Sequence, residues 1–195
     1  MTGASGIQYA LRLLECLIRS ECQVYLMMSK PAQVVMSMET DLDVPARASD
    51  AERYFSAMYG AADGQLRAFG LQEWTAPVAS GSGVPDAMVV CPCTTGTLAS
   101  IASGLCNSLL ERAADVVLKE RRQLILAPRE MPLSSIHLEN MLTLARMGAI
   151  IMPPNPGFYN RPTTLEEMID FVVARILDQL QIDHQLMPRW GLDPQ

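Results

Sequence analysis

The hydrophobic positions of this 195-residue chain form short apolar runs, separated by stretches in which apolar residues recur at helical spacing. Leu11, Leu14, Leu17 and Ile18 predict an amphipathic helix close to the start of the chain. Short continuous apolar runs bounded by turn residues are typical of strands buried on both faces. We expect such strands at 23–28, 86–90, 124–127 and 149–152.

Helical patterns alternate with these strands. Further helices are predicted up to about 39, around 51–62, from the Ser-x-x-Glu capping box at 108–111, over 134–147, and from the capping box at 164–167. This alternation predicts an α/β fold, a three-layer Rossmann-like (flavodoxin-like) parallel sheet with helices on both faces. Residues 1–181 are expected to form a single domain, and 182–195 a C-terminal tail that docks near the site.

The chain opens directly on a small-residue turn, Thr2 to Gly6, with only Met1 before it. A turn of this kind normally follows a strand and leads into a helix, where it serves either tight packing or phosphate binding. We therefore expect the first strand of the sheet to be short or missing.

Polar residues follow the predicted strands at the edge where open α/β sheets bind ligands. Ser29 follows the first predicted strand, four residues at 94–97 open a helix with three hydroxyls and a glycine, and Arg129 and Glu130 stand between prolines after the strand at 124–127. The hydroxyl-rich turn suits phosphate oxygens or flavin ring edges, although helix capping explains part of it. Ser29 fits an N-cap equally well. Residues 80–83 are predicted to be a mobile loop near the site.

Composition and charge narrow the function. Apolar residues make up 49% of the chain, charged residues 18%, and the net charge is -6, which argues against a general nucleic-acid surface. Several cations nevertheless cluster between Arg112 and Arg129, as a pocket for a small anionic ligand requires; the alternative is a salt-bridged surface helix. The longest apolar run is too short to cross a bilayer and no leader is recognisable, so we expect a cytoplasmic protein.

Five cysteines are present, and Cys91 and Cys93 resemble half of a metal site. The two histidines, His137 and His184, belong to unrelated segments. We therefore expect buried or pocket-wall cysteines and no metal.

Several segments together resemble the UbiX-like flavin prenyltransferases, a group of flavoproteins. The matching segments are TGASG at 2–6, METD at 38–41, CPCTTGTLA at 91–99, ERAADVVLKERR at 111–122, LAPRE at 126–130, MGAIIMPPNPGFYNRP at 147–162 and PRW at 188–190. The resemblance implies an enzyme that joins a dimethylallyl group from dimethylallyl phosphate to N5 and C6 of reduced FMN. The product, prenylated FMN, would serve UbiD-like decarboxylases, including the one in ubiquinone biosynthesis. It also implies a homo-oligomer, commonly a dodecamer, with sites at subunit interfaces.

The resemblance also implies site residues. FMN would be bound by Gly3, Ala4, Ser5, Ser29, Thr94, Thr95, Gly96, Thr97 and Arg129. Lys119, Tyr159 and Arg175 would hold the phosphate of the prenyl donor, with Arg112 reaching in from a neighbouring subunit. Ser5, Glu39, Glu130, Lys119 and Trp190 would take part in catalysis, through proton handling, leaving-group stabilisation or contact with the prenyl group.

The residue chemistry agrees with a metal-independent reaction. Ionisation of an allylic phosphate needs charge on the leaving group stabilised by a metal or by fixed cations, and the chain has cations but no Asp-rich metal motif. Tyr159 and Trp190 could stabilise an allylic cation through cation–π contact, and Glu130 could transfer a proton. Two alternatives remain. One is an FMN-dependent decarboxylase of the phosphopantothenoylcysteine type, whose PxMNxxMW-like segment and early histidine the chain lacks. The other is a non-catalytic flavin-binding or flavin-delivery protein.

Overall fold

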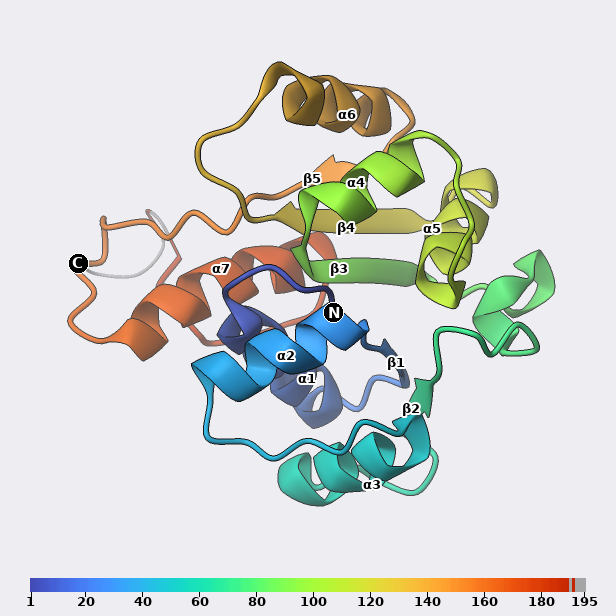
Figure 1. Cartoon of the computed structure of the whole chain (residues 1–195). Coiled ribbons are helices and arrows are strands. Elements are labelled where there is room, and N and C mark those ends of the chain that lie inside the picture. The colour runs from blue at the N-terminus through green and yellow to red at the C-terminus, as the bar shows by residue number, and fades with distance from the viewer. Residues whose placement is uncertain (190, 192–195) are drawn as a thin grey trace.

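The computed structural model describes residues 1–189 and 191, and places helices on both faces of parallel strands (Figure 1). The strands are β1 (Val24–Met27), β2 (Leu66–Phe69), β3 (Ala87–Cys93), β4 (Gln123–Pro128) and β5 (Ile150–Ile151). The helices are α1 (Ile7–Arg19), α2 (Lys30–Glu39), α3 (Ala48–Tyr59), α4 (Thr95–Ala102), α5 (Leu109–Lys119), α6 (Ser135–Arg146) and α7 (Leu165–Gln179), with short 3-10 helices η1 (Pro77–Ala79) and η2 (Gly81–Gly83). The predicted α/β class is confirmed.

The strands form two separate groups. β3, β4 and β5 make one sheet in that order, and β1 pairs with β2 in another. Every pair is parallel, with Ala87 opposite Gln123 and Val24 opposite Leu66. The carboxyl ends of paired strands therefore lie at the same edge, where the predicted polar residues follow them.

Helices cover both faces of the sheet, and the side chains of its central strand, β4, are buried alternately against one layer of helices and the other. Ile125 and Ala127 of β4 are buried in a cluster with α1 and α7, whereas Leu124 and Leu126 are buried in a cluster with α4, α5 and α6. Side chains of a strand point to opposite faces in turn. A strand covered on both sides must therefore be apolar throughout, which explains the continuous run in the sequence.

The helix starts largely follow local sequence signals. Ser108 and Thr164 each form the predicted capping box, with Glu111 and Glu167 as the reciprocal partners. The Ser29 side chain accepts a hydrogen bond from the amide of Ala32 at 3.1 Å, so this residue is an N-cap.

Residues 80–83 differ from their prediction as a mobile loop. They contain η2, which lies beside the end of α5, where a Cβ at Gly81 would collide with the carboxylate of Glu120. The colliding atoms are the ends of the flexible Glu120 and Lys119 side chains, which can move aside, so glycine is not required at this position. The segment lies next to the C-terminal end of α5, away from the edge of the sheet where the strands end and the predicted polar residues lie.

The first two residues lie between the two sheets. The Met1 ammonium donates to the Met27 carbonyl at 2.7 Å, and the Thr2 amide donates to the Pro92 carbonyl at 3.2 Å. The turn at Gly3 leads into α1, and β1 is the first strand of the described chain.

Candidate active site

Three of the predicted cofactor segments meet around Thr2. The Thr2 hydroxyl donates to the Pro92 carbonyl at 2.7 Å and accepts from the Thr94 amide at 2.8 Å, which ties the N-terminal turn to the start of α4. The Ser29 amide donates to the Met1 carbonyl at 3.1 Å, which adds the start of α2. A Cβ at Gly3 would collide with the ring of Pro31, so only glycine fits this crossing. The structure thus gathers residues 3–5, 29 and 94–97 at one edge.

Glu39, the last residue of α2, caps the start of α1. Its carboxylate accepts hydrogen bonds from the Gly6 amide at 2.9 Å and the Ile7 amide at 3.1 Å. The side chain of Gln8 donates to the Glu39 carbonyl at 3.1 Å. A carboxylate at a helix N-terminus is favoured by the helix dipole and by the otherwise unpaired amides. The amides that a phosphate could use at α1 are therefore occupied by Glu39.

Opposing effects act on the pKa of Glu39. Partial burial raises it, but hydrogen bonds from Ser5, Gly6 and Ile7 and the charge of Arg129 outweigh burial, so that the pKa lies below its ordinary value. The carboxylate is thus held ionised next to a hydroxyl and a guanidinium.

A pocket of about 440 Å³ opens beside this carboxylate. It is lined by Ser5, Gly6, Gln8, Tyr9, Glu39, Arg129, Pro154, Leu165 and Ile169. Three predicted residues, Ser5, Glu39 and Arg129, are brought together here from separate segments. Gln8 and Tyr9 were not predicted as pocket residues. They follow Ser5 by three and four positions, the spacing of one helical turn, and this spacing could have indicated that they face the same pocket.

Glu130 does not line this pocket. Its side chain is exposed and accepts a hydrogen bond from the Met131 amide at 3.3 Å. The adjacent Arg129 is anchored through its backbone, because its amide donates to the Cys93 carbonyl at 3.2 Å. The two neighbours after β4 thus have different surroundings.

The start of α4 has a side-chain cap, yet its first turn remains accessible from outside the protein. The Thr94 hydroxyl oxygen accepts from the Thr97 amide at 3.1 Å and donates to the Thr97 hydroxyl at 2.9 Å. A Cβ at Gly96 would meet only the Thr94 hydroxyl oxygen, at 4.0 Å. No protein contact in the described chain requires glycine at this position. The residue leaves the first turn of the helix accessible to a group from outside, with its amides and hydroxyls available to an anion.

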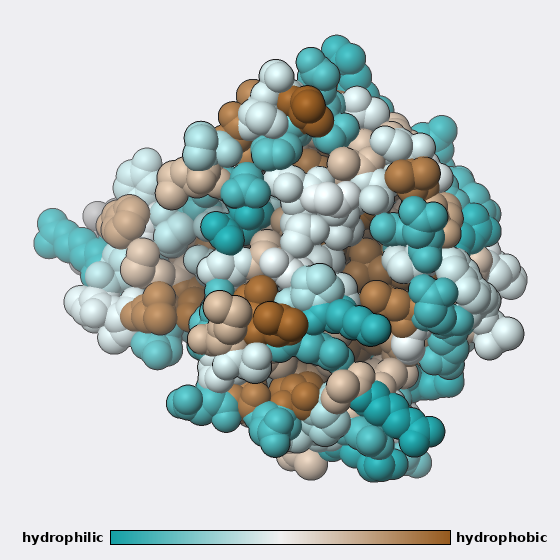
Figure 2. Space-filling view, viewed as in Figure 1, coloured by the Kyte–Doolittle hydropathy of each residue, from teal (hydrophilic) through white to brown (hydrophobic). Residues whose placement is uncertain are grey.

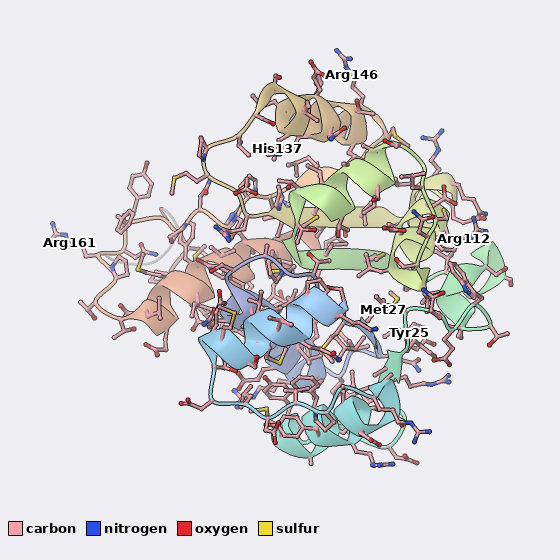
Figure 3. All side chains as sticks on the ribbon, in the orientation of Figure 1. Tyr25, Met27, Arg112, His137, Arg146 and Arg161 are labelled. Atoms are coloured by element: carbon pink, nitrogen blue, oxygen red, sulfur yellow. The ribbon has the colours of Figure 1, made fainter. Side chains whose placement is uncertain are left out.

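Arg112 and Lys119 lie elsewhere and have partners of their own. The Arg112 guanidinium donates to the Ala79 carbonyl at 3.1 Å and forms an ion pair with Asp115 at 2.7 Å, while Lys119 pairs with Glu120. Figure 3 shows Arg112 on α5 next to η1. Lys119 precedes the amino end of β4 and Arg129 follows its carboxyl end, so the six residues of this strand separate them by about 20 Å.

The remaining predicted residues also lie outside the pocket of Glu39. Arg175 is exposed in the second half of α7 and pairs with Asp178. Tyr159 is 79% exposed on the segment between β5 and α7. Trp190 lies outside the described residues, and with it the predicted contact of the tail with the site. The described part of the tail packs on the core through Ile182 and Leu186.

Cys91 and Cys93 are both buried, and burial raises the pKa of each thiol to about 12. Within residues 1–189 and 191, no group of three or more His, Cys, Asp or Glu side chains is arranged to hold a metal ion. The two thiols are therefore protonated core residues.

Comparison with known proteins identifies the family. The pattern that defines the flavoprotein family matches residues 1–177. A protein of Pseudomonas aeruginosa named flavin prenyltransferase UbiX is 57% identical over 191 residues, which cover 98% of this chain and 91% of that protein. The chain belongs to the UbiX-like flavin prenyltransferases.

Solved structures of this family have the same fold. AnUbiX (PadA1), crystallised in complex with FMN and dimethylallyl pyrophosphate, superposes with a TM-score of 0.86 at 41% identity, covering 98% of this chain and 94% of that chain. A dodecameric FMN-dependent UbiX-like decarboxylase from Escherichia coli O157:H7 gives a TM-score of 0.83 at 40% identity, covering 98% and 99%. Among the described residues of the present chain, no helix is both long and apolar enough to span a membrane.

Proposed function

We propose that this protein prenylates reduced FMN, joining a dimethylallyl group from dimethylallyl phosphate to N5 and C6 of the flavin. The allylic C–O bond breaks with release of phosphate as the terminal carbon of the dimethylallyl group bonds to N5, which loses its proton. Protonation of the remaining double bond makes the tertiary carbon electrophilic; this carbon bonds to C6, and the C6 proton is lost as the fourth ring closes. We also propose that the enzyme works in the cytoplasm and that prenylated FMN passes to a UbiD-like decarboxylase, including that of ubiquinone biosynthesis.

The observation that carries this proposal is the convergence of Ser5, Glu39 and Arg129 in one pocket at the polar edge. Beside it, the open first turn of α4 offers hydroxyls and amides that suit the phosphate of FMN. A cation, an ionised carboxylate and a hydroxyl are the groups that a reaction with an anionic flavin and a proton transfer require.

Each residue has a role in this proposal. Thr94 to Thr97 and the turn at Gly3 to Ser5 bind FMN, together with Ser29 and Arg129. The Glu39 carboxylate fixes the N-terminal turn and, through its contact with Ser5, is placed to move a proton. Glu130, which is exposed after β4, protonates the leaving phosphate or accepts the proton lost at ring closure. Trp190 is assigned to the prenyl group from the family resemblance.

We further propose that a neighbouring subunit supplies Arg112 and Lys119. The length of β4 keeps Lys119 about 20 Å from Arg129 within one chain, so both can act in one site only if they come from different chains. Arg175 and Tyr159 are both exposed and can therefore reach the site of a neighbouring subunit, where we propose that they complete the donor-phosphate site.

Exposed apolar side chains support an oligomer. Val34 and Met38 on α2 are 57% and 79% exposed, and apolar side chains reach the surface over α2 in Figure 2. Helix α6 adds Ile136, Leu138 and Leu142. Exposed apolar groups of this extent are typical of protein interfaces. We propose a homo-oligomer, with a dodecamer as the expected size.

Anaerobic incubation with reduced FMN and dimethylallyl phosphate, followed by mass spectrometry of the extracted flavin, tests the activity. The flavin is expected to gain the mass of one isoprene unit. An unchanged mass with folded, FMN-binding protein would contradict prenyl transfer and favour a flavin-binding protein. Release of CO₂ from phosphopantothenoylcysteine would favour the decarboxylase instead.

Variants test the assigned roles. Lys119→Ala and Glu130→Gln are expected to abolish the mass gain while FMN still binds, whereas Arg146→Ala, which removes a cation from the surface of α6, should leave it intact. Loss of FMN from the first two variants would show that the roles are wrong.

Mixed oligomers test the shared site. Lys119→Ala and Arg129→Ala chains, each inactive alone, should regain part of the activity when co-assembled, because some sites then receive both intact residues. Absence of any recovery in verified mixed oligomers would place both residues in the site of a single chain.

A further inference from the structure

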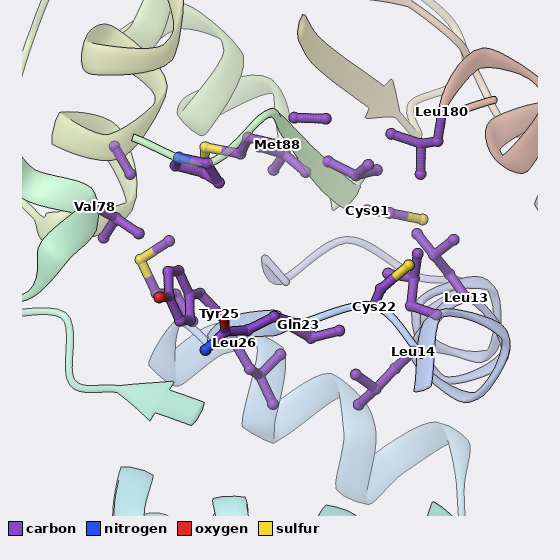
Figure 4. Close-up of a pocket in the computed structure, with 18 of the residues that line it drawn as sticks. Leu13, Leu14, Cys22, Gln23, Tyr25, Leu26, Val78, Met88, Cys91 and Leu180 are labelled. Atoms are coloured by element: carbon purple, nitrogen blue, oxygen red, sulfur yellow. The ribbon is translucent and has the colours of Figure 1, made fainter. Parts of the chain in front are cut away.

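The chain turns back on itself at the end of α7. The Ile182 amide donates to the Leu177 carbonyl at 3.0 Å, and Gln181 adopts the left-handed conformation with a φ of 58°, which is a common way to end a helix. Leu180 and Ile182 line the apolar space between β1 and β3, where Figure 4 shows Leu180. These anchors bring the following residues back along the last turn of α7, so that His184 lies against the helix.

His184 is buried, and both nitrogens of its ring have partners. Its side chain is 6% exposed. The Leu186 amide donates to Nδ1 at 3.4 Å, so Nδ1 is the acceptor of the neutral ring. Nε2 therefore carries the proton, and it donates this proton to a carboxylate oxygen of Asp178 at 3.1 Å. The backbone of the tail thus sets the tautomer of His184, and the tautomer makes the ring a donor to Asp178.

Asp178 uses its two carboxylate oxygens for two different partners. Oδ1 accepts from His184, and Oδ2 forms an ion pair with Arg175, which lies three residues earlier on α7. The Arg175 side chain is 48% exposed. Within the described residues its guanidinium reaches Asp178 through Nη1, and its other N–H donors can bind an anion. The three side chains therefore form a continuous series of contacts from the buried ring to the exposed cation.

The buried ring strengthens a contact that is weak by itself. An exposed ion pair contributes little to stability, because both side chains lose rotational freedom when they pair. Here His184 already fixes the Asp178 carboxylate, so that pairing with Arg175 does not have to order it. A long arginine side chain that is ordered before its ligand arrives loses less entropy on binding.

From these contacts we propose that His184 is a positioning residue. Through Asp178 it holds Arg175 in the orientation that binds the phosphate of the prenyl donor. This inference rests on the proposed role of Arg175 in the donor-phosphate site, and it makes the tail a part of that site. His184 and Asp178 do not touch the donor, because both act through the guanidinium.

The test measures the Kd of dimethylallyl phosphate by isothermal titration calorimetry. The protein is loaded with oxidised FMN, so that no prenyl transfer takes place during the titration. Two substitutions separate the two ring nitrogens of His184. In His184→Gln the amide nitrogen can replace Nε2 as the donor to Asp178, whereas in His184→Asn the amide oxygen can replace Nδ1 but the side chain is too short to reach Asp178.

The two substitutions should have different effects. We expect His184→Asn to raise the Kd about fivefold, and His184→Gln to change it by less than about twofold. In His184→Gln the Leu186 amide loses its acceptor, so hydrogen exchange at this amide should become faster although the donor still binds. His137→Asn, which changes the exposed histidine of α6, is the matched control and should leave the Kd unchanged.

A double-mutant cycle tests whether His184 acts through Arg175. Arg175→Ala should raise the Kd by about tenfold or more, and His184→Asn in the same protein should cause no additional loss, because residues in one series of contacts do not act independently. Asp178→Ala should raise the Kd as much as His184→Asn does. Since Asp178 is 27% exposed, this variant keeps the test decisive even if a substitution of the buried histidine unfolds the protein.

Three results would overturn the proposal. Equal weakening by His184→Asn and His184→Gln, or an undiminished effect of His184→Asn in the Arg175→Ala protein, would mean that His184 only anchors the tail. An unchanged Kd in Arg175→Ala would remove the residue through which His184 acts. Failure of the proposed function is recognised separately, because it is an unchanged flavin mass after incubation with reduced FMN, and this measurement does not enter the comparison of Kd values.

Discussion

The buried amino end of Met1 provides a quantitative test of the region between the sheets. Burial lowers the pKa of the Met1 ammonium from 8.0 to about 6, against a smaller opposite effect of Cys91 and Cys93. Below pH 6 the folded protein carries a charged ammonium among apolar walls, with the Met27 carbonyl as its hydrogen-bond acceptor. Acetylation of Met1 removes this charge and keeps the N–H donor.

The sign follows from proton binding. Between pH 6 and 8 the unfolded chain holds a proton that the folded chain has released, so the free energy of unfolding rises with pH in this window. A shift of two pKa units corresponds to about 2.7 kcal/mol. For a chain of this length the unfolding midpoint should be about 5 to 11 °C lower at pH 5.5 than at pH 8.5.

The assay is thermal unfolding by circular dichroism across this pH range, with the acetylated protein as reference. His137 and His184 are common to both proteins, so their contributions cancel in the difference. The midpoint of the unmodified chain should fall relative to the acetylated chain as the pH decreases from 8 to 6. Parallel curves would refute the reasoning, because they would mean that the amino end is solvated in the folded state.

Two further predictions concern the polar edge. Glu39→Gln should lower the free energy of unfolding at pH 7 by about 1 to 2 kcal/mol in urea titrations, because the α1 amides lose a charged acceptor. The difference between the two proteins should vanish in acid, as the pH falls through the lowered pKa of Glu39. An equal loss of stability in the exposed Glu139→Gln control would contradict this prediction. Thr94→Ala should cost about 1 kcal/mol by removing the cap of α4, whereas Thr95→Ala, inside the same turn, should cost clearly less; equal losses would show that the cap is not what stabilises this helix start.

Local patterns predicted the elements well where the physical cause is local. The apolar run of β4 follows from burial on both faces, and the capping boxes at Ser108 and Thr164 depend on residues three positions apart. Such signals can be recognised without knowledge of distant contacts. The polar ends of strands likewise predicted that Ser29 and Arg129 lie at the carboxyl edge of the strands, whereas Ser5 was assigned to the site only from the family resemblance.

Long-range contacts were not predictable in the same way. Glu39 has the sequence context of a solvated helix-end charge, yet it caps a helix that starts 32 residues earlier in the chain. Nothing within one turn of Glu39 signals this contact. The capping box at 108–111 correctly predicted the helix that carries Arg112 and Lys119, but only the direction of β4 reveals that Lys119 lies at the opposite edge from Arg129.

The separation of the two sheets also affects the tendency of the protein to aggregate. Unpaired strand edges are templates for intermolecular pairing, and folded proteins commonly protect them with a covering element. Here α1 and α5 cover both faces of the gap, so a folded neighbour cannot reach the edges of β1 and β3. An unfolded chain can, because a single extended segment fits between them. Aggregation of the protein should therefore begin with capture of unfolded copies at the edges of β1 and β3.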